Sequence, residues 1–284
     1  MIALVTATAA AYLDPDLAPL REALHREGVE AVVASWDDTT VNWSTFEAVF
    51  LRSTWDYHLN FDAFAAWIDS TSQVTTMWNP PALMRWNLDK RYLRDLADQG
   101  IPIVETIFLS PEDDESADAA VLDGDVVVKA TIGAGSHGVQ RFRRDADAAQ
   151  RYVDELLNGG RHVMVQPYLA AVDTQGETGI VVLGGVAEYA FEKGAILTGE
   201  TTSSTGLYAE ERITPRIASA DERALAERVI EVLPQTAYAR IDMLPTSNGP
   251  VISEVELVEP SLFFDVDAHA AVRTAAAFAS LLDR

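Results

Sequence analysis

The chain has 284 residues, of which 48% are hydrophobic and 23% charged. These proportions are typical of a folded globular protein, and the length allows more than one domain. The formal net charge of −23 argues against nucleic acid and anionic membranes as partners, because lysine and arginine must neutralise phosphates in such complexes. The absence of cysteine excludes disulfides, zinc–thiolate sites and thiol nucleophiles.

The first residues and the apolar runs bear on location. The opening MIALVTATAA has no basic segment of the kind that begins a signal peptide. No uninterrupted apolar run reaches the roughly 20 residues that a transmembrane helix requires. We therefore expect a cytoplasmic protein.

Residues 1–82 alternate strand-like and helix-like runs, which predicts a small parallel α/β domain. Strands are expected at 2–6, 29–36, 46–52 and 74–78, with helices after Asp14 and Asn60. Ligands of such sheets lie beyond the carboxyl ends of the strands. The run after the third strand is therefore a candidate substrate surface, with a packed aromatic turn as the alternative. Its candidate contacts are Arg52, Ser53 and Thr54.

The next segment predicts a single helix. Asn87 is a candidate N-cap, and Gly100 is a candidate C-terminal stop. Lys90 then falls in the first turn, where a cation opposes the helix dipole. This position suggests a role other than stability, and an ordinary solvated lysine is the alternative. Residues 103–109 are expected to form a strand, and 111–120 an acidic loop or short helix.

Residues 125–143, DVVVKATIGAGSHGVQRFR, place a glycine-rich loop between two strand-like runs. The glycines satisfy the G-x-G-x-x-G pattern of dinucleotide sites, but that pattern requires a helix directly after the loop. Here a strand follows, and the next helix begins only near Asp145. We therefore predict a flap whose backbone N–H groups close over phosphates, with Lys129 at its base. The flap residues are Gly133, Gly135, Ser136 and Gly138.

A β-hairpin is predicted over residues 178–194, because two alternating runs flank a Gly-Gly turn. Glu177 enters this hairpin and Lys193 leaves it. The other expected elements are a strand at 161–169, a mobile loop at 194–215, a helix opened by the capping box Ser219–Glu222 and a final helix at 267–284.

Residues 238–264 concentrate carboxylates on two strand-like runs joined by a polar turn, which predicts a second hairpin. Glu254 and Glu256 share a face because they are two residues apart, and Asp242 on the paired run can join them. Converging carboxylates repel one another unless a cation neutralises them, and such hard oxygen ligands suit Mg²⁺. Arg240 places a further cation beside this candidate metal site. A solvated acidic face is the alternative.

The order of these features along the whole chain resembles the ATP-grasp superfamily of carboxylate–amine ligases. The features are Lys90, Lys129 with its flap, Lys193, Arg240-x-Asp242 and Glu254-x-Glu256. The runs LRSTWDY, QPYL and ELVEPSLFF are similar to the glutathione-synthetase-like branch, and within it to the D-cycloserine synthetases, which are cyclo-ligases of O-ureido-serine. There are two departures. Glu256 stands where Asn is usual, which bears on the number of metal ions, and residues 175–180 read QGETGI where an EGEWSL-like run is usual.

The resemblance implies an α/β (α+β) protein with the ATP-grasp fold. A parallel α/β domain precedes two α+β subdomains that sandwich ATP. The implied division is an N-terminal substrate-side domain at 1–82, a subdomain with the glycine flap at 83–165, and a C-terminal subdomain with the metal site at 166–284.

The resemblance also implies the chemistry. The γ-phosphoryl group of ATP passes to a substrate carboxylate, and an amine attacks the resulting acyl phosphate. The implied cofactors are ATP and Mg²⁺, with Mg²⁺ on Asp242, Glu254 and Glu256. The implied catalytic residues are Arg240 and Lys193. The implied nucleotide contacts are Lys90 and Lys129 with the flap, an adenine hinge of Gln166, Tyr168 and Leu169, and Glu177 on the ribose. The implied substrate contacts are Arg52, Ser53, Thr54 and Ser261.

Three functions fit this pattern. Intramolecular cyclisation of an O-ureido-serine-like amino acid leads, and an intermolecular dipeptide-type or glutathione-synthetase-like ligase is the alternative. A nucleotide-binding module without turnover is disfavoured, because the lysines, the arginine and the three acids are all present. The expected partners are ATP and a small amino-acid-like carboxylate. Ligases of this kind are often homo-oligomers, and the sequence leaves the oligomeric state open.

Overall fold

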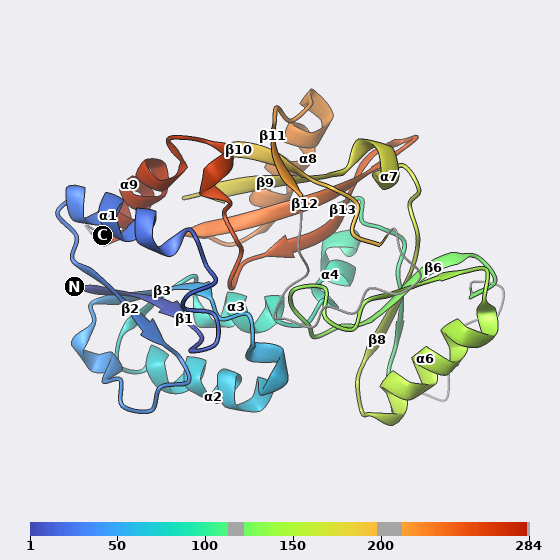
Figure 1. Cartoon of the computed structure of the whole chain (residues 1–284), viewed down its shortest axis with the longest axis horizontal. Helices are drawn as coiled ribbons and strands as arrows, with labels where there is room; N and C mark the ends of the chain where they lie inside the picture. Colours follow the sequence, from blue (N-terminus) through green and yellow to red (C-terminus); the bar gives the residue numbers. More distant parts are fainter. Residues whose placement is uncertain (113–121, 198–211, 283–284) are drawn as a thin grey trace.

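Three β-sheets with their helices organise the computed structural model, which describes residues 1–112, 122–197 and 212–282 (Figure 1). The parallel sheet lies beside the five-stranded sheet, and the third sheet extends to the right of the view with helix α6 (Figure 1). In the described ranges, none of the helices combines the length and apolarity needed to cross a bilayer.

The first sheet is fully parallel, with the order β2-β1-β3-β4. Its strands are β1 (Ile2–Thr6), β2 (Ala31–Ser35), β3 (Ala48–Ser53) and β4 (Thr76–Trp78). Helix α1 (Leu17–Arg26) packs on one face and α2 (Phe61–Ser72) on the other. Strands β1 and β3 are buried along their whole length, as expected when both faces are covered. The predicted parallel α/β domain is confirmed.

The second sheet is antiparallel, with the order β11-β10-β9-β12-β13. Its strands are β9 (Glu177–Leu183), β10 (Val186–Lys193), β11 (Ile213–Arg216), β12 (Tyr238–Thr246) and β13 (Gly249–Glu256). Helix α8 (Ala220–Val232) covers one face and α9 (Ala270–Leu282) the other. Both predicted hairpins are confirmed, and α8 begins with the predicted capping box.

The third sheet is antiparallel, with the order β5-β8-β6-β7. Its strands are β5 (Ile107–Leu109), β6 (Asp125–Ala130), β7 (Gln140–Arg143) and β8 (Val163–Pro167), and helix α6 spans Ala146–Asn158. Val126 and Val128 pack against α6 in a small core. Because side chains alternate along a strand, Lys129 then points to the opposite face.

The predicted helix from Asn87 to Gly100 is wrong in one respect. Two helices form instead, α3 (Pro81–Asn87) and α4 (Tyr92–Asp98), and Lys90 lies in the turn between them. Asn87 ends α3. Its amide donates to Val255 O (2.7 Å) and its carbonyl oxygen accepts from Leu257 N (2.8 Å). This buried tertiary contact with the end of β13 replaces the predicted cap.

Two further expectations are corrected. Strand β5 covers only Ile107–Leu109 of the predicted 103–109, because Ile103 forms an isolated bridge with Ile252 on β13. The predicted loop at 194–215 ends in strand β11, which pairs with the edge of β10. Most of that loop and of the acidic segment 111–120 lies outside the described residues.

A shared hydrophobic core joins the parallel sheet to the five-stranded sheet. Helices α1 and α9 pack against each other, next to the two chain ends (Figure 1). Phe50 of β3 stacks on Phe278 of α9 with ring centroids 4.0 Å apart. The first and last thirds of the sequence therefore share one hydrophobic core. The division of the chain into three parts at 1–82, 83–165 and 166–284 remains a proposal.

Asp16 makes a second link between the ends of the chain. Its carboxylate accepts backbone N–H groups of Leu262 (3.0 Å), Phe263 (2.9 Å) and Phe264 (2.9 Å). Phe263 has a left-handed backbone with φ of 50°, a conformation that costs energy for a bulky residue. The three hydrogen bonds offset this strain and hold residues 259–264, which we call the substrate loop.

We predict that Asp16→Asn destabilises the protein by about 1–3 kcal/mol, because an amide NH₂ replaces one acceptor oxygen and leaves a buried N–H unsatisfied. The midpoint of urea unfolding measures the effect. The matched control is Asp265→Asn, an exposed aspartate in the next turn, which should stay within about 0.5 kcal/mol of wild type. Equal stability of the two variants would contradict the role of Asp16.

Candidate active site

A cavity of about 480 Å³ is lined by residues of the five-stranded sheet and the third sheet, and by residues that follow strands β1 and β3. Most of the residues singled out from the sequence line it. They are Lys90, Lys129, Gly133, Gly135, Ser136, Gln166, Tyr168, Leu169, Glu177, Lys193, Arg240, Glu254, Glu256 and Ser261. Asp242, Gly138, Arg52, Ser53 and Thr54 do not line it.

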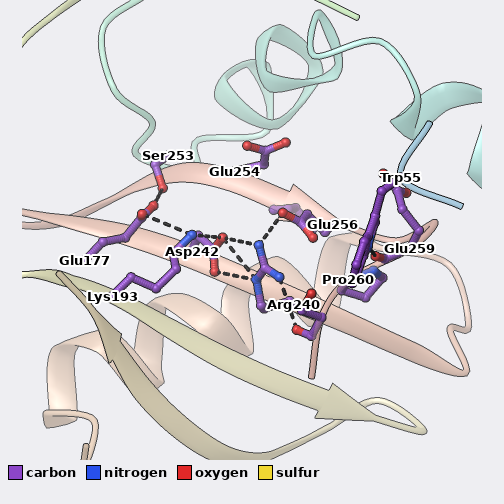
Figure 2. Close-up of polar contacts among 12 residues, drawn as sticks. Trp55, Glu177, Lys193, Arg240, Asp242, Ser253, Glu254, Glu256, Glu259 and Pro260 are labelled. Atoms are coloured by element: carbon purple, nitrogen blue, oxygen red, sulfur yellow. Dashed lines mark hydrogen bonds and ion pairs between the residues drawn. The ribbon is translucent and has the colours of Figure 1, made fainter. Parts of the chain in front are cut away.

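A chain of ion pairs runs along β9, β10, β12 and β13 beneath the cavity (Figure 2). Asp242 is its centre and is only 1% exposed. Lys193 Nζ lies 2.8 Å from Asp242 Oδ2, and Arg240 Nε donates to Asp242 Oδ1 at 3.0 Å. Lys193 also pairs with Glu177 (3.1 Å), and Arg240 with Glu256. We call these five residues the ion network.

The strand register explains why these groups meet. In the β12–β13 hairpin, Arg240 lies opposite Glu256 and Asp242 opposite Glu254. Directly opposed residues of antiparallel strands share a face, so all four side chains project from the same side. The spacing of two residues within each strand therefore places one arginine and three carboxylates on the same face of the hairpin.

Lys90 connects the helical segment to this row. Its Nζ lies 3.0 Å from Glu254 Oε1 and donates to Gly133 O at 2.7 Å. Burial lowers the pKa of Lys90, but the nearby carboxylates of Glu254, Glu256 and Glu259 outweigh it and raise the pKa. The amine therefore stays charged and ties the flap to β13.

Lys129 differs from the other two lysines. In the described part of the chain its amine has no hydrogen bond or ion pair within bonding distance, although it lines the cavity. Burial lowers its pKa, with Glu254 acting in the opposite direction. A half-buried amine without a counter-ion favours an anionic ligand.

The acids of the site carry an excess of negative charge. Burial raises the pKa of Glu256 to about 7, against the effect of Arg240 and together with repulsion from Glu254 and Asp242. Burial and the charge of Glu256 raise the pKa of Glu259 to about 8. Both carboxylates line the cavity, so a bound cation would lower these pKa values and relieve the repulsion.

The three predicted magnesium ligands differ in how far they are open to the cavity. Among the described residues, Asp242, Glu254 and Glu256 do not form a group of three that surrounds a common point. Both oxygens of Asp242 are bound by Arg240, and Lys193 binds one of them. Glu254 and Glu256 present oxygens to the cavity and fit Mg²⁺, which usually needs only one or two protein carboxylates. Asp242 lies behind them and supports their cationic neighbours.

The glycine flap lies between β6 and β7, as predicted, and leans on the N-terminal domain. Tyr57 Oη donates to Gly133 O at 3.3 Å, and the His137 ring lies 5.2 Å from that of His58. Positive φ at Gly135 (59°) and Gly138 (68°) requires glycine, and Ser136 adopts the same left-handed region (60°). Gly138 shapes the flap without lining the cavity.

The predicted hinge lies at the end of β8. Gln166 donates to Thr106 Oγ1 at 2.9 Å, and the N–H of Tyr168 donates to Asp125 O at 2.7 Å. The Tyr168 N–H is thus already used within the protein. Leu169 N–H has no backbone acceptor among the described residues, so it is the hinge donor that remains for a ligand.

The predicted substrate run occupies a different place from the one expected. Arg52, Ser53 and Thr54 are fully buried behind the cavity wall. Arg52 donates to Pro260 O at 3.0 Å, so it supports the substrate loop from behind. Its neighbours Trp55 and Tyr57 line the cavity instead.

Trp55 and Tyr57, which line the cavity, belong to the run predicted as a substrate surface, although neither was named as a contact. Glu259 is a lining residue that the sequence analysis did not select. One available signal was the position of Glu259, three residues after Glu256 in a run already recognised. A second was lysine scarcity. The chain has only three lysines, at 90, 129 and 193, and all three line this cavity.

Comparison with known proteins agrees with this geometry. Residues 2–79 match the family described as D-cycloserine synthetase DcsG, N-terminal domain. The cycloserine biosynthesis protein DcsG of Streptomyces lavendulae is 38% identical, over 99% of each chain. The crystal structure of D-cycloserine synthetase DcsG superposes with a TM-score of 0.90 at 36% identity, over 99% of each chain.

A more distant structure shows the same fold. The D-alanine–D-alanine ligase of Bacillus anthracis, solved as a complex with ATP, has a TM-score of 0.67 at 16% identity, over 99% of this chain and 94% of that one. The full-length identity to the Streptomyces protein establishes the relationship more closely. The chain therefore belongs to the D-cycloserine-synthetase-like family of ATP-grasp ligases, which are ATP-dependent carboxylate–amine ligases.

Proposed function

We propose that this ligase activates the carboxylate of a single O-ureido-serine-like amino acid with ATP and closes it into a ring. The observation that carries the proposal is the cavity itself. Its lining combines the three lysines and Arg240 with the oxygen ligands Glu254 and Glu256. The relative that shares 38% identity over the full chain bears the name of a cycloserine biosynthesis protein.

The reaction has two balanced steps. A carboxylate oxygen of the substrate attacks the γ-phosphorus of ATP, and ADP leaves. A ureido nitrogen of the same molecule then attacks the carbonyl carbon, phosphate leaves, and the nitrogen loses its proton. The first step depends on positioning and charge neutralisation more than on covalent help from the protein.

The cations of the cavity supply that neutralisation. Lys129, which has no counter-ion among the described residues, holds phosphate oxygens together with Lys90. Arg240 and Lys193 face the transferring phosphoryl group and the tetrahedral intermediate, where charge develops. Because Asp242 holds both of these cations in place, their geometry is set before the substrate arrives.

Mg²⁺ fits the two exposed carboxylates of the site. Glu254 and Glu256 would hold it, and Asp242 would join only if its partners moved. When bound, the ion would neutralise the phosphates and oppose the burial and charge repulsion that raise the pKa of Glu256 to about 7.

The remaining predicted contacts concern the nucleoside and the closing of the site. Leu169 N–H is the hinge donor that we assign to the purine, and Glu177 faces the ribose while its carboxylate is held by Lys193 and Ser253. The flap at 133–138 excludes water, without which an acyl phosphate hydrolyses.

The first test is phosphate release from ATP and Mg²⁺ with amino acids and O-substituted serines, offered singly and in pairs. We expect release with one enantiomer of O-ureido-serine alone, because the nucleophile belongs to the same molecule. Release only with pairs would establish an intermolecular ligase instead. If the protein binds ATP but releases phosphate with none of the compounds tested, the proposed substrate is wrong.

A second prediction concerns the unpaired lysine. Lys129→Met should raise the KM for ATP by at least tenfold, since a charge-assisted phosphate contact contributes about 1.5–3 kcal/mol. The fold should be unchanged, because no internal ion pair is lost. Arg223→Met, which removes an exposed cation from α8, is the control. An unchanged KM in Lys129→Met would remove this role.

A third prediction distinguishes the roles of Glu254 and Asp242. Glu254→Gln should abolish turnover with little effect on folding, because Glu254 is partly exposed to the cavity. Asp242→Asn should abolish turnover and also destabilise the protein by about 3–5 kcal/mol, because two buried cations lose their shared counter-ion.

Urea unfolding and phosphate release, measured on the same samples, check both statements. The control for stability is Glu22→Gln, which breaks an exposed pair with Arg26 whose side chains are each 66% exposed and should cost about 0.5 kcal/mol or less. Wild-type stability of Asp242→Asn would show that the ion network does not hold this part of the fold.

A further inference from the structure

One carboxylate of the cavity has no partner in the part of the chain that the structure describes. Five acids line the cavity: Asp16, Glu177, Glu254, Glu256 and Glu259. The first four are bound by backbone N–H groups or by cations. Within residues 1–112, 122–197 and 212–282, the Glu259 carboxylate makes no hydrogen bond or ion pair. This carboxyl group is therefore available to a ligand, and a bound cation would favour its ionised form.

The position of Glu259 is fixed by its own backbone. Its carbonyl oxygen accepts from Trp55 Nε1 at 3.1 Å, and the next carbonyl, of Pro260, accepts from Arg52 at 3.0 Å. Ser261 O accepts from Arg240 Nη1 at 3.1 Å, and Leu262 O accepts from Tyr189 Oη at 2.7 Å. Four successive carbonyls of the substrate loop are thus held by side chains from other elements, so the Glu259 side chain is presented by a rigid segment.

Aromatic rings accompany this carboxylate. Trp55 and Tyr57 line the same cavity, and Glu259 exerts the strongest charge effect on Tyr57. Figure 2 shows Glu259 beside Trp55, at the opposite end of the ion network from Glu177 and Lys193. Ring faces attract cations electrostatically, and more strongly when water is excluded. A carboxylate that shares a cavity with two aromatic rings is therefore suited to an organic ammonium group.

The two ends of the cavity differ in charge. Lys129 and the hinge residue Tyr168 belong to the third sheet and its edge, where an amine without a partner favours phosphate. Glu259 lies on the N-terminal domain side, next to Trp55, where a carboxylate without a partner favours a cation. In Figure 2, Arg240 and Glu256 lie between Lys193 and Glu259. A substrate whose carboxylate reaches Arg240 would extend its other groups toward Glu259.

We propose that Glu259, with the rings of Trp55 and Tyr57, binds the α-ammonium group of the amino-acid substrate and thereby selects amino acids over simple carboxylic acids. This proposal rests on the proposed function, in which the substrate is an α-amino acid. Activation converts its carboxylate to an acyl phosphate, whereas the ammonium group is unchanged and can orient the molecule through both steps.

The test compares two compounds in wild type and Glu259→Gln. The probes are O-ureido-serine and 3-(ureidooxy)propanoate, which is the same molecule without the α-ammonium group. Their Kd values are measured by calorimetry in the presence of Mg²⁺ and a non-hydrolysable ATP analogue. The matched control is Glu105→Gln, which removes the same charge from an exposed site.

Wild type should bind the ammonium compound about tenfold to a hundredfold more tightly than its deamino analogue, the range expected for a charged hydrogen bond. Glu259→Gln should lose that preference by weakening only the ammonium compound, with affinity for the ATP analogue within twofold of wild type. Glu105→Gln should behave as wild type.

Two outcomes overturn the proposal. Equal weakening of both compounds in Glu259→Gln, or a raised Mg²⁺ requirement, would show that this carboxylate serves the metal or the fold. An unchanged preference would show that the ammonium group binds elsewhere.

Phosphate release, measured separately, keeps the two proposals distinct. Binding with a Glu259-dependent preference but no release would contradict the proposed function and leave the ammonium site standing. Phosphate release without a Glu259-dependent preference would support the proposed function and contradict the ammonium site. If neither compound binds, both proposals are contradicted.

Discussion

The buried ion pair between Arg240 and Asp242 is the interaction on which the site depends. Charges are costly to bury unless they are paired and hydrogen-bonded, so Asp242 can remain ionised at 1% exposure only because Arg240 and Lys193 bind it. The same guanidinium reaches Glu256 and the carbonyl of Ser261. One charged group therefore sets the position of the acid row and of the substrate loop together.

The substrate loop connects the ion network to the N-terminal domain through hydrogen bonds. Its carbonyls accept from Arg52 and Trp55, and its N–H groups donate to Asp16. These residues are more than 200 positions away in sequence, so the loop acts as a joint between the parallel sheet and the five-stranded sheet. The cavity floor and the wall facing the substrate are consequently parts of one hydrogen-bonded unit, while the flap reaches that wall from the third sheet through Tyr57.

Cations and carboxylates in the cavity are nearly matched, and this balance bears on ligand binding. Lys90, Lys193 and Arg240 each hold at least one acid, whereas Lys129 and Glu259 have no such partner among the described residues. ATP brings negative charge and Mg²⁺ brings positive charge. We expect both to enter together, because either alone would leave buried charge uncompensated. We expect Lys129 at one end of the cavity to bind phosphate, and Glu259 at the other end to bind the charged group of the substrate.

The sequence by itself determined the features that depend on local spacing. Alternation along strands predicted the parallel domain, both hairpins and the shared face of Glu254 and Glu256, and the missing helix after the glycine loop predicted the flap. Only the tertiary structure decided the rest, because those contacts join distant segments. It bonded Asn87 to the end of β13, buried Arg52 behind the loop it supports and formed β11 on the edge of β10. Among the described residues, it also left the Glu259 carboxylate without a partner. Spacing shows which face a side chain occupies, but its partner across the fold depends on packing that no local pattern encodes.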